Sequence, residues 1–129
     1  MVANVDILQI PLQVTHGCLV ASIQVDLNDS VLKRFEEELL QKIRETQVKG
    51  VIFDVSGLDI MDADEFRALK KCMSMAQLLG PRAVIVGINA GIASALVDMN
   101  VDTAKLIATR TMDRAFEVLA EQASSENVG

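Results

Sequence analysis

Five acidic side chains gather in the middle of this 129-residue sequence, where they could bind a metal ion or a protein partner. They are Asp54, Asp59, Asp62, Asp64 and Glu65. Carboxylate oxygens are the ligands that Mg²⁺ prefers. Carboxylates also complement the partial positive charge at the start of a helix. The cluster therefore admits three interpretations: a magnesium site, a capped helix start on the surface, or a recognition surface for a protein.

The residues that would have to accompany a catalytic acid are missing from the expected positions. Asp62-x-Asp64 superficially resembles a phosphatase nucleophile motif, but no full strand directly precedes it. Phosphoryl transfer would also call for a Lys at a neighbouring strand end. The later strand ends instead carry the segments 87–89 (Gly-Ile-Asn) and 109–111 (Thr-Arg-Thr). We therefore predict no metal and no catalytic residue.

Other groups with chemical potential fit no catalytic motif. His16 is the only His and lies in a turn, without a base or nucleophile nearby in sequence. Ser56 is not part of a G-x-S-x-G nucleophile elbow. The segment 87–91 lacks the third Gly and the Lys or Ser of a phosphate loop. Cys18 and Cys72 are too far apart for a C-x-x-C site, so we expect two reduced thiols and no cofactor.

Hydrophobic patterns around the acidic cluster predict alternating strands and helices. We expect strands at 7–14, 18–25, 51–55, 83–86 and 106–108, the first two forming an antiparallel hairpin. The apolar run 51–55 is typical of a strand buried on both faces of a parallel sheet. We expect helices at 28–47, at 62–80, after Asn89 and after Thr111, with Leu79, Ala93 and Val97 facing the core. This order predicts a single α/β domain with a mostly parallel sheet and about four helices.

Composition excludes several classes of protein. The net charge of −6 and the absence of Tyr and Trp argue against binding of nucleic acid, which needs cationic and stacking side chains. No apolar run approaches the ~20 residues of a membrane helix. The first residues lack the pattern of a signal peptide, so we expect a cytoplasmic protein. We place the domain at 1–122 and a flexible C-terminal tail at 123–129.

The segment 51–62, Val-Ile-Phe-Asp-Val-Ser-Gly-Leu-Asp-Ile-Met-Asp, resembles the STAS domain family of anti-sigma-factor antagonists. In that family a strand ending in Asp leads through a Ser-Gly turn to an Asp at a helix start. Segments 76–80, 84–88 and 96–99 strengthen the resemblance. The segment 22–27 and the helix after it look most like the S-type scaffold of the stressosome.

The resemblance implies a non-enzymatic scaffold in a large cytoplasmic complex. Such proteins form homo- and hetero-oligomers with sensor-type STAS proteins and hold a serine/threonine kinase, which is released after phosphorylation at the start of the second helix. The alternative is a simple anti-sigma-factor antagonist that binds a kinase-type anti-sigma factor. Either role implies a partner-binding surface on the segment that contains Ser56, Gly57, Asp59, Met61, Asp62, Asp64 and Glu65.

The sequence departs from the family at the position of the phosphate acceptor. Where the family has Ser or Thr directly after the Asp, this chain has Ala63, which has no hydroxyl. A second regulatory position aligns more weakly with Ala95. Three interpretations follow: a natural variant that works without phosphorylation, an engineered Ser→Ala form, or regulation moved to Ser56 or Ser94.

Overall fold

The computed structural model describes residues 9–103 and 105–128, with side chains described only as far as residue 121. Five strands and four helices follow one another in the predicted order. Their bounds are β1 Leu12–Thr15, β2 Cys18–Ser22, α1 Asp29–Thr46, β3 Gly50–Asp54, α2 Ala63–Leu78, β4 Arg82–Val86, α3 Ala90–Asp98, β5 Ala108–Thr109 and α4 Met112–Val128. The predicted α/β class is confirmed.

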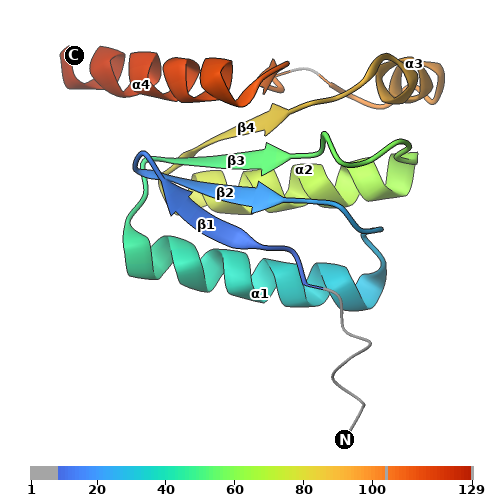
Figure 1. Cartoon of the computed structure of the whole chain (residues 1–129), viewed down its shortest axis with the longest axis horizontal. Coiled ribbons are helices and arrows are strands. Elements are labelled where there is room, and N and C mark those ends of the chain that lie inside the picture. The colour runs from blue at the N-terminus through green and yellow to red at the C-terminus, as the bar shows by residue number, and fades with distance from the viewer. Residues whose placement is uncertain (1–8, 104, 129) are drawn as a thin grey trace, which may run out of the picture.

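The strands form one sheet in the order β1-β2-β3-β4-β5 (Figure 1). Only β1 is antiparallel to its neighbour; β2, β3, β4 and β5 run parallel. The hairpin turn places both His16 (φ 52°) and Gly17 (φ 75°) in the left-handed region, as a tight turn between twisted strands requires. Because parallel strands end at a common edge, the loops after β2, β3 and β4 meet there.

Helices cover both faces of the sheet. In Figure 1, α1 and α2 lie on one face and α4 on the other, while α3 lies beyond the end of β4. The larger core fills the space under α1 and α2, where the rings of Phe35 and Phe53 meet edge to face at 6.2 Å. A smaller core under α4 contains Ile52, Val84 and Leu119. Side chains along β3 alternate between the two cores, which explains its uninterrupted apolar sequence.

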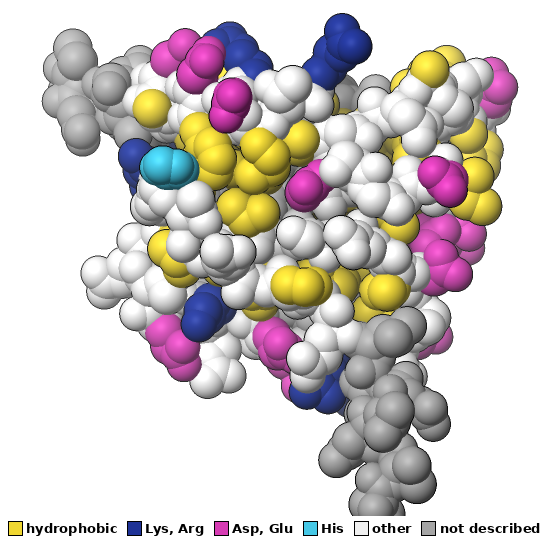
Figure 2. Space-filling model, viewed as in Figure 1, with side chains coloured by type: hydrophobic (Ala, Val, Ile, Leu, Met, Phe, Trp, Pro, Cys, Tyr) yellow, Lys and Arg dark blue, Asp and Glu magenta, His cyan; other side chains and the backbone are white. Residues whose placement is uncertain are grey.

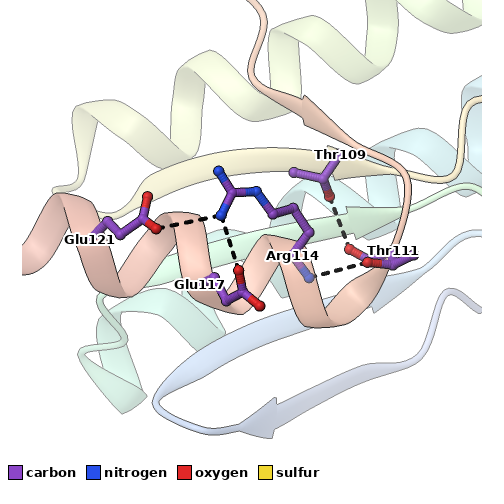
Figure 3. Close-up of polar contacts among 5 residues, drawn as sticks. All are labelled: Thr109, Thr111, Arg114, Glu117 and Glu121. Atoms are coloured by element: carbon purple, nitrogen blue, oxygen red, sulfur yellow. Dashed lines mark hydrogen bonds and ion pairs between the residues drawn. The ribbon is translucent and has the colours of Figure 1, made fainter.

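Polar side chains begin the helices as the sequence predicts. Asn28, Asp62 and Asn89 each accept a backbone N–H three residues further on. The Thr111 hydroxyl does the same for the N–H of Arg114 at 3.2 Å (Figure 3). Each such cap satisfies a donor that would otherwise have no partner, and is worth about 1 kcal/mol.

Three expected core residues lie on the surface. Leu79 is 46% exposed because α2 ends at Leu78, just before Gly80 and Pro81. Ala93 and Val97 are also exposed, Val97 by 72%, because α3 buries only Ile92 and Leu96. The buried stripe of this nine-residue helix is therefore narrow.

Strand and helix ends differ from the prediction in detail. The first strand begins after Pro11 instead of at residue 7, and residues 7 and 8 lie outside the described part of the chain. The last helix continues through Val128, past the domain boundary expected at residue 122. The flexibility of segment 123–129 stays a prediction. Within the described residues, no helix is long and apolar enough to cross a membrane.

Cys72 lies on α2 and is fully buried, and burial raises the pKa of its thiol to about 12. The nearby carboxylate of Glu36 adds to this rise, whereas Lys71 opposes it. In the unfolded chain a thiol titrates near pH ~8.5. Above that pH the unfolded chain releases a proton that the folded chain keeps, so stability falls as the pH rises.

Between pH ~9 and ~11 the free energy of unfolding should fall less steeply with pH in Cys72→Ala than in the wild type, by about 1.4 kcal/mol per pH unit. Urea unfolding of wild type and variant at several pH values measures this difference. A fall in stability with the same slope in both proteins would show that Cys72 ionises normally in the folded chain.

Candidate functional site

The turn after β3 is closed by a hydrogen-bonded pair, Asp54 and Ser56. Oδ1 of Asp54 accepts both the backbone N–H of Ser56 at 3.0 Å and its hydroxyl at 2.6 Å. Ser56 is exposed and its proton is directed at a carboxylate. This bond orders the turn. The single His, His16, lies in the hairpin turn before β2, at the amino end of the strands, whereas Ser56 follows the carboxyl end of β3. The geometry therefore gives Ser56 no imidazole base.

Two glycines allow the loops at this edge to approach one another closely. Gly87 has φ +88°, and a Cβ built there would lie 2.6 Å from Cβ and 2.8 Å from Cα of Ser56. A Cβ on Gly57 would lie 2.8 Å from Cγ of Gln24. The turn after β3 is therefore held between the segments that follow β2 and β4.

Asn89 joins the loop before α2 to the start of α3. Its Oδ1 accepts the N–H of Ile92 at 2.8 Å, and its Nδ2 donates to the backbone carbonyls of Leu58 and Asp59, both at 3.3 Å. One amide thus caps α3 and fixes the loop beside it. The loop 58–61 has a defined position relative to α3 for this reason.

The start of α2 carries a complete capping box. Oδ1 of Asp62 accepts the N–H of Glu65 at 2.7 Å, and Oε1 of Glu65 accepts the N–H of Asp62 at 3.2 Å. The other oxygen of Glu65 accepts the N–H of Leu27 at 3.3 Å. These carboxylates are therefore engaged by the backbone and connect α2 to the segment after β2.

Ala63 is the first residue of α2, directly after the Asp62 cap, and its methyl group is partly buried. Asp64, next along the chain, pairs with Arg67 at 3.1 Å on the open surface. Such exposed pairs stabilise a protein by less than about 1 kcal/mol.

A shallow groove of about 470 Å³ separates the starts of α1 and α2. Its wall combines carboxylates with apolar side chains: Asp26, Leu27, Asn28, Asp29, Leu32, Ile60, Asp62, Asp64, Glu65 and Ala68. Ile60 is 81% exposed. No group of three or more His, Cys, Asp or Glu among the described residues has an arrangement that could hold a metal ion. The groove is suited to a partner that is both basic and apolar.

Most of the residues predicted for a binding surface lie at this edge. Ser56, Gly57, Asp59, Asp62 and Asp64 are exposed, and Glu65 is partly buried. Met61 is the exception: its side chain is 3% exposed and packs in the larger core, so it cannot belong to a surface. Of the two positions on α3, Ser94 is exposed and Ala95 is partly buried.

The sequence did not predict that the apolar Ile60 and the residues around the start of α1 belong to this edge. Ile60 was not predicted as a surface residue, and nothing in the alternation around it tells which of Ile60 and Met61 faces outward. Asp26 and Asp29 share the groove with Asp62 only because the ends of β2 and β3 are neighbours. The order of the parallel strands was the signal that could have predicted this shared groove.

The fold and the edge together define an α/β domain that carries capped helix starts and an exposed groove at the carboxyl ends of its parallel strands. The model of the STAS domain family matches residues 9–112. The chain belongs to the STAS domain family.

Solved structures give more specific similarities. A variant of RsbS from Moorella thermoacetica, in which Glu replaces a Ser, is 28% identical with a TM-score of 0.76. The superposition covers 89% of this chain and 97% of that one. A chain from the molecular architecture of the stressosome, a signal integration and transduction hub, is also 28% identical, with a TM-score of 0.77 over 88% and 98% of the two chains.

A curated relative matches only in part. RsbRA of Bacillus subtilis (strain 168), an RsbT co-antagonist protein, is 22% identical over 89 residues. That alignment covers 69% of this chain but 32% of RsbRA, so the chain spans about a third of this relative. SpoIIAA, an anti-sigma factor antagonist, shares the fold at 13% identity with a TM-score of 0.65 over 87% of this chain and 96% of that one.

We expect Gly87→Ala to lower the free energy of unfolding by about 2–4 kcal/mol, because a positive φ and a clash with Ser56 act together. Gly80→Ala is the matched control: Gly80 also has a positive φ (+122°), but no atom lies within 4 Å of the position that a Cβ would occupy there. The control should lose about 1 kcal/mol. Urea denaturation measures both, and equal losses would show that the Ser56 contact is unimportant.

Proposed function

We propose that this protein is a non-enzymatic scaffold of a stressosome, which co-assembles with sensor-type STAS proteins and sequesters a serine/threonine kinase. The observation that carries the proposal is the similarity to RsbS over nearly the whole of both chains. Similarity to the stressosome chain and to RsbRA supports the same role. The likeness to SpoIIAA extends to the fold alone, so it gives less support to the alternative, a simple anti-sigma-factor antagonist.

The geometry of the edge supports binding over catalysis. Asp54, Asp62 and Glu65 accept backbone N–H groups, which holds these carboxylates in position but leaves them poorly placed to move a proton. The exposed Ile60 beside the carboxylates offers an apolar anchor for a partner. We assign the kinase to this edge, formed by the loop 56–62 and the starts of α1 and α2.

We expect the purified chain to form a large complex with a sensor-type STAS protein and to retain the kinase in it. Ile60→Glu should weaken kinase binding at least about tenfold, because an apolar anchor becomes a charge beside other carboxylates. Leu78→Glu is the matched control, since Leu78 is 87% exposed at the far end of α2. Native mass spectrometry measures the assembly and calorimetry the affinity.

Two results would count against the proposal. A chain that ignores the sensor protein is no stressosome scaffold, and recovery with a kinase-type anti-sigma factor would favour the alternative. Equal losses of kinase affinity in the two variants would show that the kinase does not bind at the Ile60 edge.

The lack of a hydroxyl at Ala63 leads to a separate prediction about regulation. Incubation of the wild-type chain with the kinase and ATP should leave residue 63 unmodified, whereas Ala63→Ser should accept one phosphate there. The added hydroxyl occupies the first position of a helix that Asp62 already caps, so it should change stability by less than about 0.5 kcal/mol. Intact mass and peptide mapping measure the phosphate. An unchanged phosphate content in Ala63→Ser would contradict the correspondence with the family's acceptor position.

A further inference from the structure

Ile60 is exposed because its neighbours anchor the loop before α2. Leu58 and Met61 are buried in the larger core, whereas Ile60 points outward. The N–H of Leu58 also donates to the carbonyl of Val55 at 3.0 Å. Ile60 thus lies on a short connection between two buried residues, and the position of its side chain depends on how firmly the backbone just before it is held.

The amide of Asn89 holds this backbone from another element. Its Nδ2 donates to the carbonyl oxygens of Leu58 and Asp59, both at 3.3 Å, while its Oδ1 accepts the N–H of Ile92 at 2.8 Å. An amide that is bonded at both ends is fixed in one orientation, because a rotation breaks bonds at both ends. Asn89 therefore ties the main chain before Ile60 to the first turn of α3.

Helix α3 gives this link a firm base. Ile92 and Leu96 of α3 are buried in the larger core, which also holds Leu58 and Met61. Figure 2 shows hydrophobic and acidic side chains close together on the side of the molecule where Figure 1 places α3 and the start of α2. The loop that carries Ile60 therefore lies between two helix starts, and Asn89 bonds it to one of them.

Capping alone does not require an asparagine at residue 89. Ser and Asp cap helices about as well as Asn, and Asp62 and Thr111 are the caps of α2 and α4. An Asn side chain adds two N–H donors, placed so that its acceptor and its donors can bond at the same time. In Asn89 both kinds of group are used, since the acceptor caps α3 and the donors hold the loop.

We propose that Asn89 is a positioning residue of the Ile60 edge: by holding the loop that presents Ile60, it raises the affinity of this edge for the kinase. The inference rests on the proposed function, in which the kinase binds at this edge. An apolar anchor on an ordered loop binds more tightly than the same anchor on a mobile loop, because ordering a loop during association costs free energy. The effect requires no contact between Asn89 and the kinase.

Two substitutions separate the cap from the donors. Asn89→Ser keeps an oxygen that can cap α3 but removes the amide donors, whereas Asn89→Ala removes both. Urea unfolding should therefore find Asn89→Ala less stable than Asn89→Ser. Kinase affinity, measured by calorimetry, should instead fall by the same factor in both variants, about three- to tenfold, since both lose the donors.

Backbone NMR relaxation of the chain alone gives a readout that does not involve the kinase. The order parameters of Asp59 and Ile60 should be near those of rigid backbone in the wild type, about 0.85, and below about 0.6 in both variants. Thr111→Ala is the control, because it removes the cap of α4 on the other face of the sheet. It should lower stability and leave these order parameters and the kinase affinity unchanged.

Two outcomes would overturn the proposal. One is a kinase affinity that follows stability, with Asn89→Ser close to the wild type, because it would show that Asn89 acts only as a helix cap. The other is a loop whose order parameters are unchanged in both variants. A wild-type chain that binds no kinase would refute the proposed function, and the order parameters would then decide by themselves whether Asn89 positions the loop.

Discussion

Burial of β3 on both faces is the constraint on which the rest of the structure depends. Val51 and Phe53 point into the larger core and Ile52 into the smaller one, and all three have no exposed surface (0%). A strand of this kind needs helices on both sides. The crossovers α1 and α2 cover one face, and α4 covers the other. The same parallel arrangement brings the loops after β2, β3 and β4 to one edge, where the candidate site is formed.

Carboxylates at that edge are held by the backbone more than by one another. Asp54 closes the turn at Ser56, Asp62 caps α2, and Glu65 accepts N–H groups from both Asp62 and Leu27. A capping interaction is worth about 1 kcal/mol, enough to explain acidic residues at these positions without any metal. The same bonds orient the edge as a rigid surface. A rigid surface loses little conformational entropy when a partner binds.

The fold was predictable because its signals are local and consistent. Apolar runs marked β3 and β4, and Asn28, Asp62 and Asn89 marked the helix starts. The predictions that failed depend on tertiary packing: the short α3 leaves Val97 exposed, and Met61 turns inward while Ile60 turns outward.

Only the part of the candidate site that is contiguous in the sequence could be predicted. The loop 54–65 was identified from its own residues, but the groove that it shares with the start of α1 arises from the adjacency of β2 and β3.

The structure also shows why the fold needs no hydroxyl at residue 63. The first residue of a helix needs no side-chain hydrogen bond when the preceding residue supplies the cap, as Asp62 does here. We therefore propose that the residue type at 63 follows function; phosphorylation of this edge would then require another hydroxyl, such as that of Ser56 or Ser94. Ser56 donates its proton to Asp54 at 2.6 Å, so a phosphate on Ser56 would break that bond and place two anions together at the end of β3. Ser94 is exposed on α3, whose start is joined to the loop 58–59 through Asn89. Of the two hydroxyls, Ser94 is the one that can be modified without disturbing the turn after β3.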